Sequence, residues 1–167
     1  DCLWSFPKAV EGVNLQANPL YVILDIGCTK SMGSRRAVDA FRQNCGSAGI
    51  TTEILPSSSY FTFAGGGGAK IYETCRIWFP TTPPTYTDVD ICEQGSVPIL
   101  LSVFQMRNMN MTLEMTSEAV LLTCPMLGMK SRPCPMSTSH HLVVNLADIH
   151  KTPSRPLPTS RLGTCAF

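Results

Sequence analysis

The sequence predicts a mostly β protein of one globular domain, with one or two short helices. Short segments rich in β-branched and aromatic residues recur along the chain and are separated by clusters of Gly, Pro, Ser and Asn. Apolar residues make up 44% of the 167 residues and charged residues only 15%, which is typical of a chain that buries a core. Because only one stretch has clear helical periodicity, these observations favour strands over helices.

The first elements follow an irregular entry segment, residues 1–18. Residues 21–24 are a short, continuous apolar run, which predicts a strand buried on both faces that ends at Asp25. Residues 34–45 carry apolar side chains at helical spacing, and Gly46 follows where a C-cap glycine belongs. The sequence therefore predicts one short helix, although two arginines in its first turn oppose the helix dipole.

A long β-hairpin is predicted in the middle of the chain. After a Ser-rich turn at 57–59, residues 60–63 are expected to form one strand, residues 64–69 a glycine-rich tip and residues 71–79 the returning strand. The Pro-rich stretch 80–84 ends it, since proline cannot donate to a strand ladder. Alternation in the returning strand places four apolar side chains on one face: Ile71, Cys75, Ile77 and Phe79.

Four further strands are expected between turn-forming clusters, at residues 97–101, 111–115, 120–123 and 141–146. Residues 19–148 are therefore expected to form the folded domain. The remaining residues, 149–167, are rich in Pro, Ser, Thr and Arg, which indicates a tail or linker.

Composition argues against several functional classes. With 13 basic and 12 acidic residues and no long run of either sign, the chain lacks the basic footprint of a nucleic-acid-binding protein. Its apolar runs are far shorter than a membrane span. The eight cysteines are spread singly, which favours reduced thiols and an intracellular location, cytoplasmic or particle-associated. Because the chain starts at Asp1 rather than Met, we expect it to be cut from a longer polypeptide.

The segment most informative about chemistry is residues 22–29, an apolar strand that runs into Asp25, Gly27 and Thr29. A strand end can lift a carboxylate into a cleft, and Gly allows a turn tight enough for the backbone to donate to that carboxylate. A hydroxyl two residues further on can hold the turn. On its own an Asp-x-Gly triplet after a strand is usually an ordinary turn.

This segment resembles the active-site motif of the retropepsin-like aspartic proteases of retroviral and retrotransposon polyproteins. Three later segments resemble other parts of that family in the same order. Residues 60–79 resemble the flap hairpin, with Phe63, Ala64, Gly65, Gly66, Gly67 and Gly68 at its substrate-binding tip. The second apolar motif of the family is resembled by Ile99, Leu100, Leu101 and Ser102, although the family more often has Gly in place of Ser102. Residues 140–146 resemble the closing strand.

The resemblance implies a closed, antiparallel acid-protease-type β-barrel that works as a homodimer. The function that the resemblance implies is that of an aspartic endopeptidase cleaving extended peptide segments of its own polyprotein through an activated water. Asp25 is the implied catalytic residue, and no metal or organic cofactor, membrane or nucleic-acid partner is implied. Aspartic proteases need two carboxylates that share a proton, and this chain has a single Asp-x-Gly. The second Asp25 is therefore expected from another copy across a two-fold axis.

Around Asp25 the residues implied to support the active site are Ile26, Gly27, Cys28 and Thr29. Ile26 departs from the family, which has Thr or Ser there to form hydrogen bonds across the dimer. A Thr at this position would restore the hydroxyl and is expected to tighten association. The alternative is a catalytically inactive, dimeric binding or scaffold domain derived from a protease, because the isoleucine removes that pair of hydrogen bonds.

Other motifs favour structural roles. The glycine run 65–68 lacks the remaining residues of a phosphate-binding loop and lies between strands. A zinc site built from Cys124, Cys134, His140 and His141 would lack Cys-x-x-Cys spacing. No histidine is close in sequence to activate Cys28 as a nucleophile. The methionines of residues 106–115 suit core packing better than a binding surface.

Overall fold

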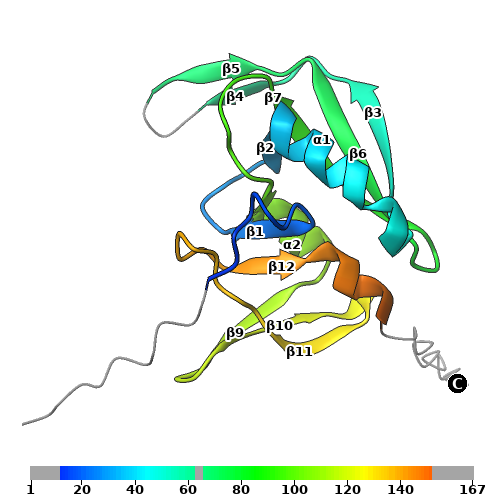
Figure 1. Ribbon diagram of the computed structural model, residues 1–167, viewed down its shortest axis with the longest axis vertical. Helices are drawn as coiled ribbons and strands as arrows, with labels where there is room; N and C mark the ends of the chain where they lie inside the picture. Colours follow the sequence, from blue (N-terminus) through cyan, green and yellow to red (C-terminus); the bar gives the residue numbers. More distant parts are fainter. Residues whose placement is uncertain (1–11, 63–65, 152–167) are drawn as a thin grey trace, which may run out of the picture.

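Strands dominate the structure, a computed structural model that describes residues 12–62 and 66–151 (Figure 1), so the predicted mostly β class is confirmed. The largest sheet has seven strands in the order β12-β1-β8-β2-β7-β6-β3. Its members are β1 (Tyr21–Asp25), β2 (Met32–Ser34), β3 (Thr51–Pro56), β6 (Glu73–Phe79), β7 (Thr85–Cys92), β8 (Leu100–Ser102) and β12 (Val143–Asn145).

The sheet is mixed, which corrects the expectation of an antiparallel one. β1 runs antiparallel to β12 but parallel to β8, and β2 runs parallel to β7. The two edge strands, β12 and β3, do not pair with each other, so the described strands form no closed barrel. Parallel pairing of β1 and β8 has a consequence for the site, because it brings the ends of both strands to the same edge of the sheet.

Two smaller sheets complete the strand structure. β9 (Thr112–Met115), β10 (Val120–Cys124) and β11 (Met129–Pro133) form a meander, which lies at the bottom of Figure 1. β4 (Tyr60–Thr62) pairs only with β5 (Gly68–Lys70). The four strands expected after the hairpin are present as β8, β9, β10 and β12, with bounds that differ from the predicted ones by at most three residues.

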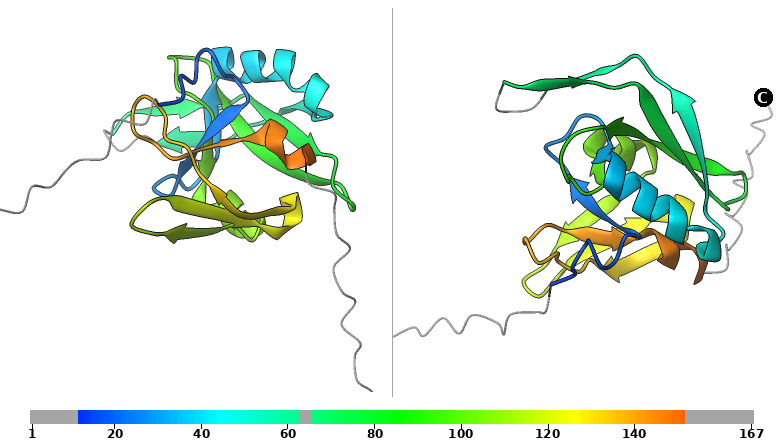
Figure 2. Two further views of the ribbon diagram at one scale, coloured as in Figure 1. Left: turned by 60° about the horizontal axis from the view of Figure 1, so that its bottom comes forward. Right: turned by 45° about the horizontal axis from the view of Figure 1, so that its top comes forward.

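The hairpin is longer than predicted. Residues 57–59 are not the turn that precedes it but a bend within its outgoing arm, because β3 already pairs with β6 from Thr51↔Trp78 to Pro56↔Glu73. β4 and β5 continue the same ribbon beyond the bend. Figure 2 shows this outer part projecting away from the main sheet as a two-stranded arm. In the returning strand the predicted alternation holds: Ile71, Cys75, Ile77 and Phe79 are all buried.

The predicted short helix is α1 (Arg35–Asn44), with a second, α2 (Val103–Asn108), after β8. Ser34 caps α1 by accepting a hydrogen bond from the Ala37 N–H, and Val38 and Phe41 are buried. The prediction that Gly46 caps the end of α1 is wrong. A 3-10 turn (Gly46–Ala48) follows the helix, and Gly49 takes the left-handed conformation (φ 69°). Six-residue α2 is capped by Ser102.

One continuous apolar core joins the main sheet, both helices and the meander. It includes Val22, Phe41, Ile77, Leu122 and Ile149, the last from the 3-10 helix Leu146–Lys151. Among the described residues, no helix is long and apolar enough to cross a membrane. The cysteines of this part of the chain are free thiols, namely Cys28, Cys45, Cys75, Cys92, Cys124 and Cys134.

Candidate active site at the end of the first strand

Asp25 is the last residue of β1. The three residues before it, Val22, Ile23 and Leu24, are buried, whereas Asp25 is half-buried and the next two residues are exposed. The apolar strand is held between β12 and β8, which fixes its end within the sheet. The chain therefore presents a carboxylate at the edge of a rigid element rather than on a free loop.

The turn after Asp25 is organised by that carboxylate. The Gly27 N–H donates to Asp25 Oδ1 at 2.9 Å, and the Cys28 N–H donates to the Asp25 carbonyl oxygen at 3.3 Å. Gly27 thus provides the backbone donor that the sequence indicated. Within the described part of the chain, Asp25 has no ion-pair partner and forms no hydrogen bond with another carboxyl group.

Cys28 and Thr29 lie in the same turn. The Cys28 thiol donates to the Lys30 carbonyl at 2.7 Å. Burial, with a smaller contribution from the nearby Asp25 carboxylate, raises the pKa of this thiol above its ordinary value. A raised pKa leaves less thiolate at neutral pH, which disfavours a nucleophilic role. The Thr29 side chain is exposed and makes no hydrogen bond to the residues that the structure describes.

The hydroxyl that holds this loop belongs to Ser31, a residue that the sequence did not single out. Ser31 is buried, and its Oγ accepts a hydrogen bond from the Ser102 N–H at 2.9 Å. It also donates to Ser102 Oγ at 3.2 Å. Ser102 Oγ in turn accepts from the Gln105 N–H at the start of α2. A hydroxyl close to the Asp-x-Gly was the only signal in the sequence, and it predicted Thr29 instead.

The second apolar motif lies beside Asp25, as the parallel register requires. Leu100 and Leu101 pair with Ile23 and Leu24, and Ser102 lies opposite Asp25. Ile99, Leu101 and Ser102 are buried, and Leu100 is half-buried. The Val103 N–H donates to the Cys28 carbonyl at 3.1 Å, which ties the start of α2 to the Asp25 loop. Two of the sequence motifs therefore come together in space.

Three exposed apolar side chains emerge at this edge of the sheet. Ile26 follows Asp25 and is 66% exposed, while Val103 and Phe104 follow Ser102 and are 43% and 61% exposed. We refer to Ile26, Val103 and Phe104 as the apolar rim. Large exposed apolar side chains thus directly follow both Asp25 and its register partner Ser102.

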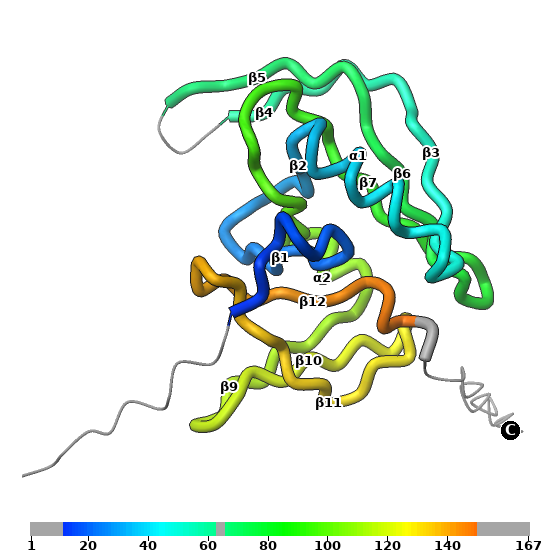
Figure 3. Tube along the Cα trace, in the orientation of Figure 1, coloured from blue at the N-terminus to red at the C-terminus, as the bar shows by residue number. Residues whose placement is uncertain are grey.

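The glycine-rich tip is only partly described. Phe63, Ala64 and Gly65 lie outside the described residues; Gly66 and Gly67 are exposed, and Gly66 has φ 82°. Gly68 lies in β5 against the Tyr60 ring, where a Cβ would be only 2.2 Å from the Tyr60 hydroxyl oxygen. The tube in Figure 3 and both views of Figure 2 show the β4–β5 arm projecting on the same side of the molecule as the loop after β1.

No metal-ligating cluster surrounds Asp25 in the part of the chain that the structure describes. The described residues contain no group of three or more His, Cys, Asp or Glu side chains that could hold a metal ion. One surface pocket is lined by residues that include Leu15, Tyr21 and Ala37, and another by residues that include Arg132 and Val144. Asp25 lines neither of them.

No family model, curated protein or solved structure matches this chain.

Proposed function

We propose that this chain is a retropepsin-like aspartic endopeptidase that acts as a homodimer on extended peptide segments of its own polyprotein. The observation that carries the proposal is the position of Asp25. Its carboxylate stands at the end of a buried strand, accepts the Gly27 N–H and lies opposite Ser102 of the second apolar motif. The proposed location is intracellular, in the cytoplasm or in a particle.

The chemistry follows from two such carboxylates. When two Asp25 side chains face each other they share one proton, because both cannot ionise at close range. The ionised carboxylate takes a proton from a water, whose oxygen attacks the scissile carbonyl carbon. The protonated carboxyl group donates a hydrogen bond to the carbonyl oxygen. The tetrahedral intermediate then collapses with cleavage of the C–N bond, and the carboxyl group that took the proton from water passes it to the leaving amine. No metal or organic cofactor takes part in this proposal.

A second copy of the chain is the partner that completes the site. One chain brings a single carboxylate to this edge, and no other carboxyl group of the described residues forms a hydrogen bond with it. The apolar rim directly follows Asp25 and Ser102, and burying its three side chains against a second copy would favour association.

The arm formed by β4 and β5 is proposed to be the flap. It leaves the main sheet at the bend, and among the described strands β4 and β5 pair only with each other. It projects on the same side of the molecule as the Asp25 loop, where it can cover an extended peptide and exclude water (Figure 2). The closed acid-protease barrel of the family is not formed by the described strands, so the proposal rests on the site and the arm rather than on barrel closure.

Ile26 supports a second candidate, a dimeric binding or scaffold domain without hydrolysis. Its exposed, apolar side chain stands where the family places a hydroxyl. Such a domain would keep the two-fold contact and the peptide groove but would lack a correctly held dyad.

A peptidase assay separates the two candidates. Purified protein would be incubated with peptides that cover the parent polyprotein, beside Asp25→Asn as the inactive variant. Asp39→Asn, at a half-buried acid on α1, is the matched control for a neutralised carboxylate. Cleavage by wild type and Asp39→Asn but not by Asp25→Asn supports the endopeptidase. Peptide binding without cleavage by wild type supports the scaffold domain.

A further inference from the structure

The Asp90 carboxylate joins the two arms of the hairpin where it bends. Asp90 Oδ1 accepts a hydrogen bond from Thr74 Oγ1 at 2.8 Å, and Oδ2 accepts one from Ser59 Oγ at 3.0 Å. Thr74 is its cross-strand partner in β6, whereas Ser59 lies in the bend before β4. One side chain of β7 thus holds both arms.

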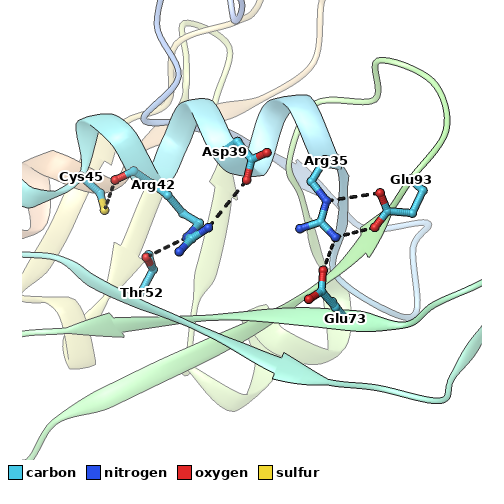
Figure 4. Close-up of polar contacts among 7 residues, drawn as sticks. All are labelled: Arg35, Asp39, Arg42, Cys45, Thr52, Glu73 and Glu93. Carbon is cyan, nitrogen blue, oxygen red and sulfur yellow. Dashed lines mark hydrogen bonds and ion pairs between the residues drawn. The ribbon is translucent and has the colours of Figure 1, made fainter.

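Before the bend, the hairpin strands β3 and β6 are held to the rest of the protein. Figure 4 shows Arg35 of α1 in contact with Glu73 and Glu93, and Arg42 of α1 donating to Thr52. β6 also pairs with β7 along its length. The start of the arm is therefore anchored by a helix and by a neighbouring strand.

Backbone hydrogen bonds continue the hairpin through the bend toward β4 and β5. Two backbone hydrogen bonds cross the bend, from Ser57 N–H to the Tyr72 carbonyl at 2.8 Å and from Ile71 N–H to the Ser59 carbonyl at 2.9 Å. Beyond them β4 and β5 pair only with each other. At the bend, the Asp90 carboxylate binds side chains of both arms, and the Ile71 side chain is buried.

Asp90 also contacts the loop that carries Asp25. Its N–H donates to the Ser31 carbonyl at 2.9 Å, and Ser31 Oγ accepts the Ser102 N–H opposite Asp25. The residue that holds the bend is therefore hydrogen-bonded to the segment that positions the candidate catalytic group.

Stability alone does not account for a carboxylate here. Asp90 is half-buried and has no ion-pair partner among the described residues, since its oxygens are satisfied by two neutral hydroxyls. Burying charge without a cation is costly. A carboxylate nevertheless offers what an amide cannot, two acceptor oxygens for two hydroxyl donors.

We propose that Asp90 is a positioning residue that fixes the direction of the β4–β5 arm relative to the Asp25 loop. Its effect on catalysis rests on the proposed endopeptidase function, in which the arm covers the substrate. Its effect on the bend does not depend on that function.

Amide hydrogen exchange, read residue by residue by NMR, tests the effect on the bend. Asp90→Asn keeps the shape of the side chain but replaces one acceptor with a donor, so the Ser57 and Ile71 amides are expected to exchange about tenfold faster. Asp88→Asn is the matched control, because Asp88 lies on the same face of β7 and pairs with Arg76 instead. Equal exchange of these amides in the two variants would overturn the proposal.

A second pair of variants covers the case in which Asp90→Asn fails to fold. Thr74→Val removes the hydroxyl with almost no change of shape, and Thr74→Ser retains it. Faster exchange with Val and wild-type exchange with Ser is expected. If Val and Ser behave alike, the hydroxyl contact does not hold the bend and the proposal is wrong.

Peptide kinetics test the catalytic consequence. Asp90→Asn is expected to raise KM about tenfold and to change kcat about twofold or less, the pattern of weakened substrate binding. An unchanged KM together with faster exchange at the bend would overturn the positioning role in catalysis. Absence of cleavage by wild type would contradict the proposed endopeptidase, while the exchange measurements would still decide whether Asp90 holds the bend.

Discussion

Ser31 and Ser102 are 71 positions apart in the chain, yet the Ser31 hydroxyl accepts the Ser102 N–H at 2.9 Å and donates to the Ser102 hydroxyl. Both residues are buried. This pair connects the loop after Asp25 to β8, the strand that pairs in parallel with β1.

Ser31→Ala is expected to destabilise the protein by about 1–3 kcal/mol, because it leaves the buried Ser102 N–H without an acceptor. Chemical denaturation followed by circular dichroism measures the change. Ser47→Ala is the control, since the exposed Ser47 hydroxyl only donates to a carbonyl at the end of α1. Equal stabilities of the two variants would show that the Ser31 contact contributes little.

Local patterns were sufficient where an element is apolar and continuous or strictly periodic. The run before Asp25 predicted β1, the helical spacing predicted α1, and the alternation from Ile71 to Phe79 predicted the buried face of the returning arm. In each case neighbouring residues contain the whole signal.

Strands that depend on distant partners were missed. β2 is three residues long and includes Gly33, whose added Cβ would lie 3.0 Å from the Ile99 side chain, so glycine there allows close strand packing. β7 does alternate, with Thr87, Val89 and Ile91 buried, but the charged residues between them obscured the pattern. β3 and β11 are largely exposed and carry little periodic signal.

The candidate site was predicted in part for the same reason. Asp25 and Gly27 are adjacent in sequence, so their hydrogen bond follows from the turn. Ser31 and Asp90 find their partners only after β2, β7 and β8 assemble. No spacing of residues in the sequence predicts those contacts.

Asp25→Asn is expected to abolish peptidase activity and leave the fold intact. An amide oxygen can still accept the Gly27 N–H, so the turn should persist, but an amide cannot share a proton as a carboxyl group does. Peptide cleavage and thermal unfolding, measured on the same preparations, check both halves. Equal cleavage by wild type and variant would remove Asp25 from the mechanism.

Activity is expected to peak on the acid side of neutrality. Only the singly ionised dyad is competent, and its second apparent pKa lies below about 7 in aspartic proteases. The measurement is kcat/KM against pH with one peptide. A flat profile between about pH 4 and 9 is incompatible with a carboxylate dyad.

The contact between Glu93 and Arg35 makes the free energy of unfolding depend on pH. Hydrogen bonding to Arg35 lowers the pKa of Glu93 below its ordinary value of 4.5. A lowered pKa in the folded state means that the stabilisation is complete above the ordinary value and is lost as pH falls through the folded pKa.

Glu93→Gln is therefore expected to be less stable than wild type near neutral pH, by about 0.5 kcal/mol because both groups are partly exposed to solvent. The two proteins should converge in stability as pH falls below 4.5 and through the lowered folded pKa. Urea denaturation at several pH values measures the difference. Glu118→Gln is the control, since Glu118 has no ion-pair partner within the described part of the chain. A difference that persists unchanged at low pH would contradict the linkage.

Ile26→Thr tests how two copies of the chain meet. The resemblance to retropepsins predicts that a threonine hydroxyl would tighten the dimer. The exposed apolar rim favours the opposite result, a weaker dimer, because Ile26 is exposed, as are Val103 and Phe104, and can pack in a dry contact between two copies. Each threonine would then lose about 1 kcal/mol of apolar burial, and two copies would weaken association roughly tenfold to thirtyfold.

Sedimentation equilibrium and the loss of activity on dilution measure this association. Phe104→Ser should weaken it as well, since Phe104 belongs to the same rim. Met115→Thr is the control, because Met115 is 72% exposed but lies on β9 in another sheet. Weaker association for both rim variants, with Met115→Thr unchanged, supports an apolar two-fold contact. Tighter association of Ile26→Thr would instead show that hydroxyl groups can bridge the two Asp25 loops, and Ile26 would then be the residue that weakens the enzyme.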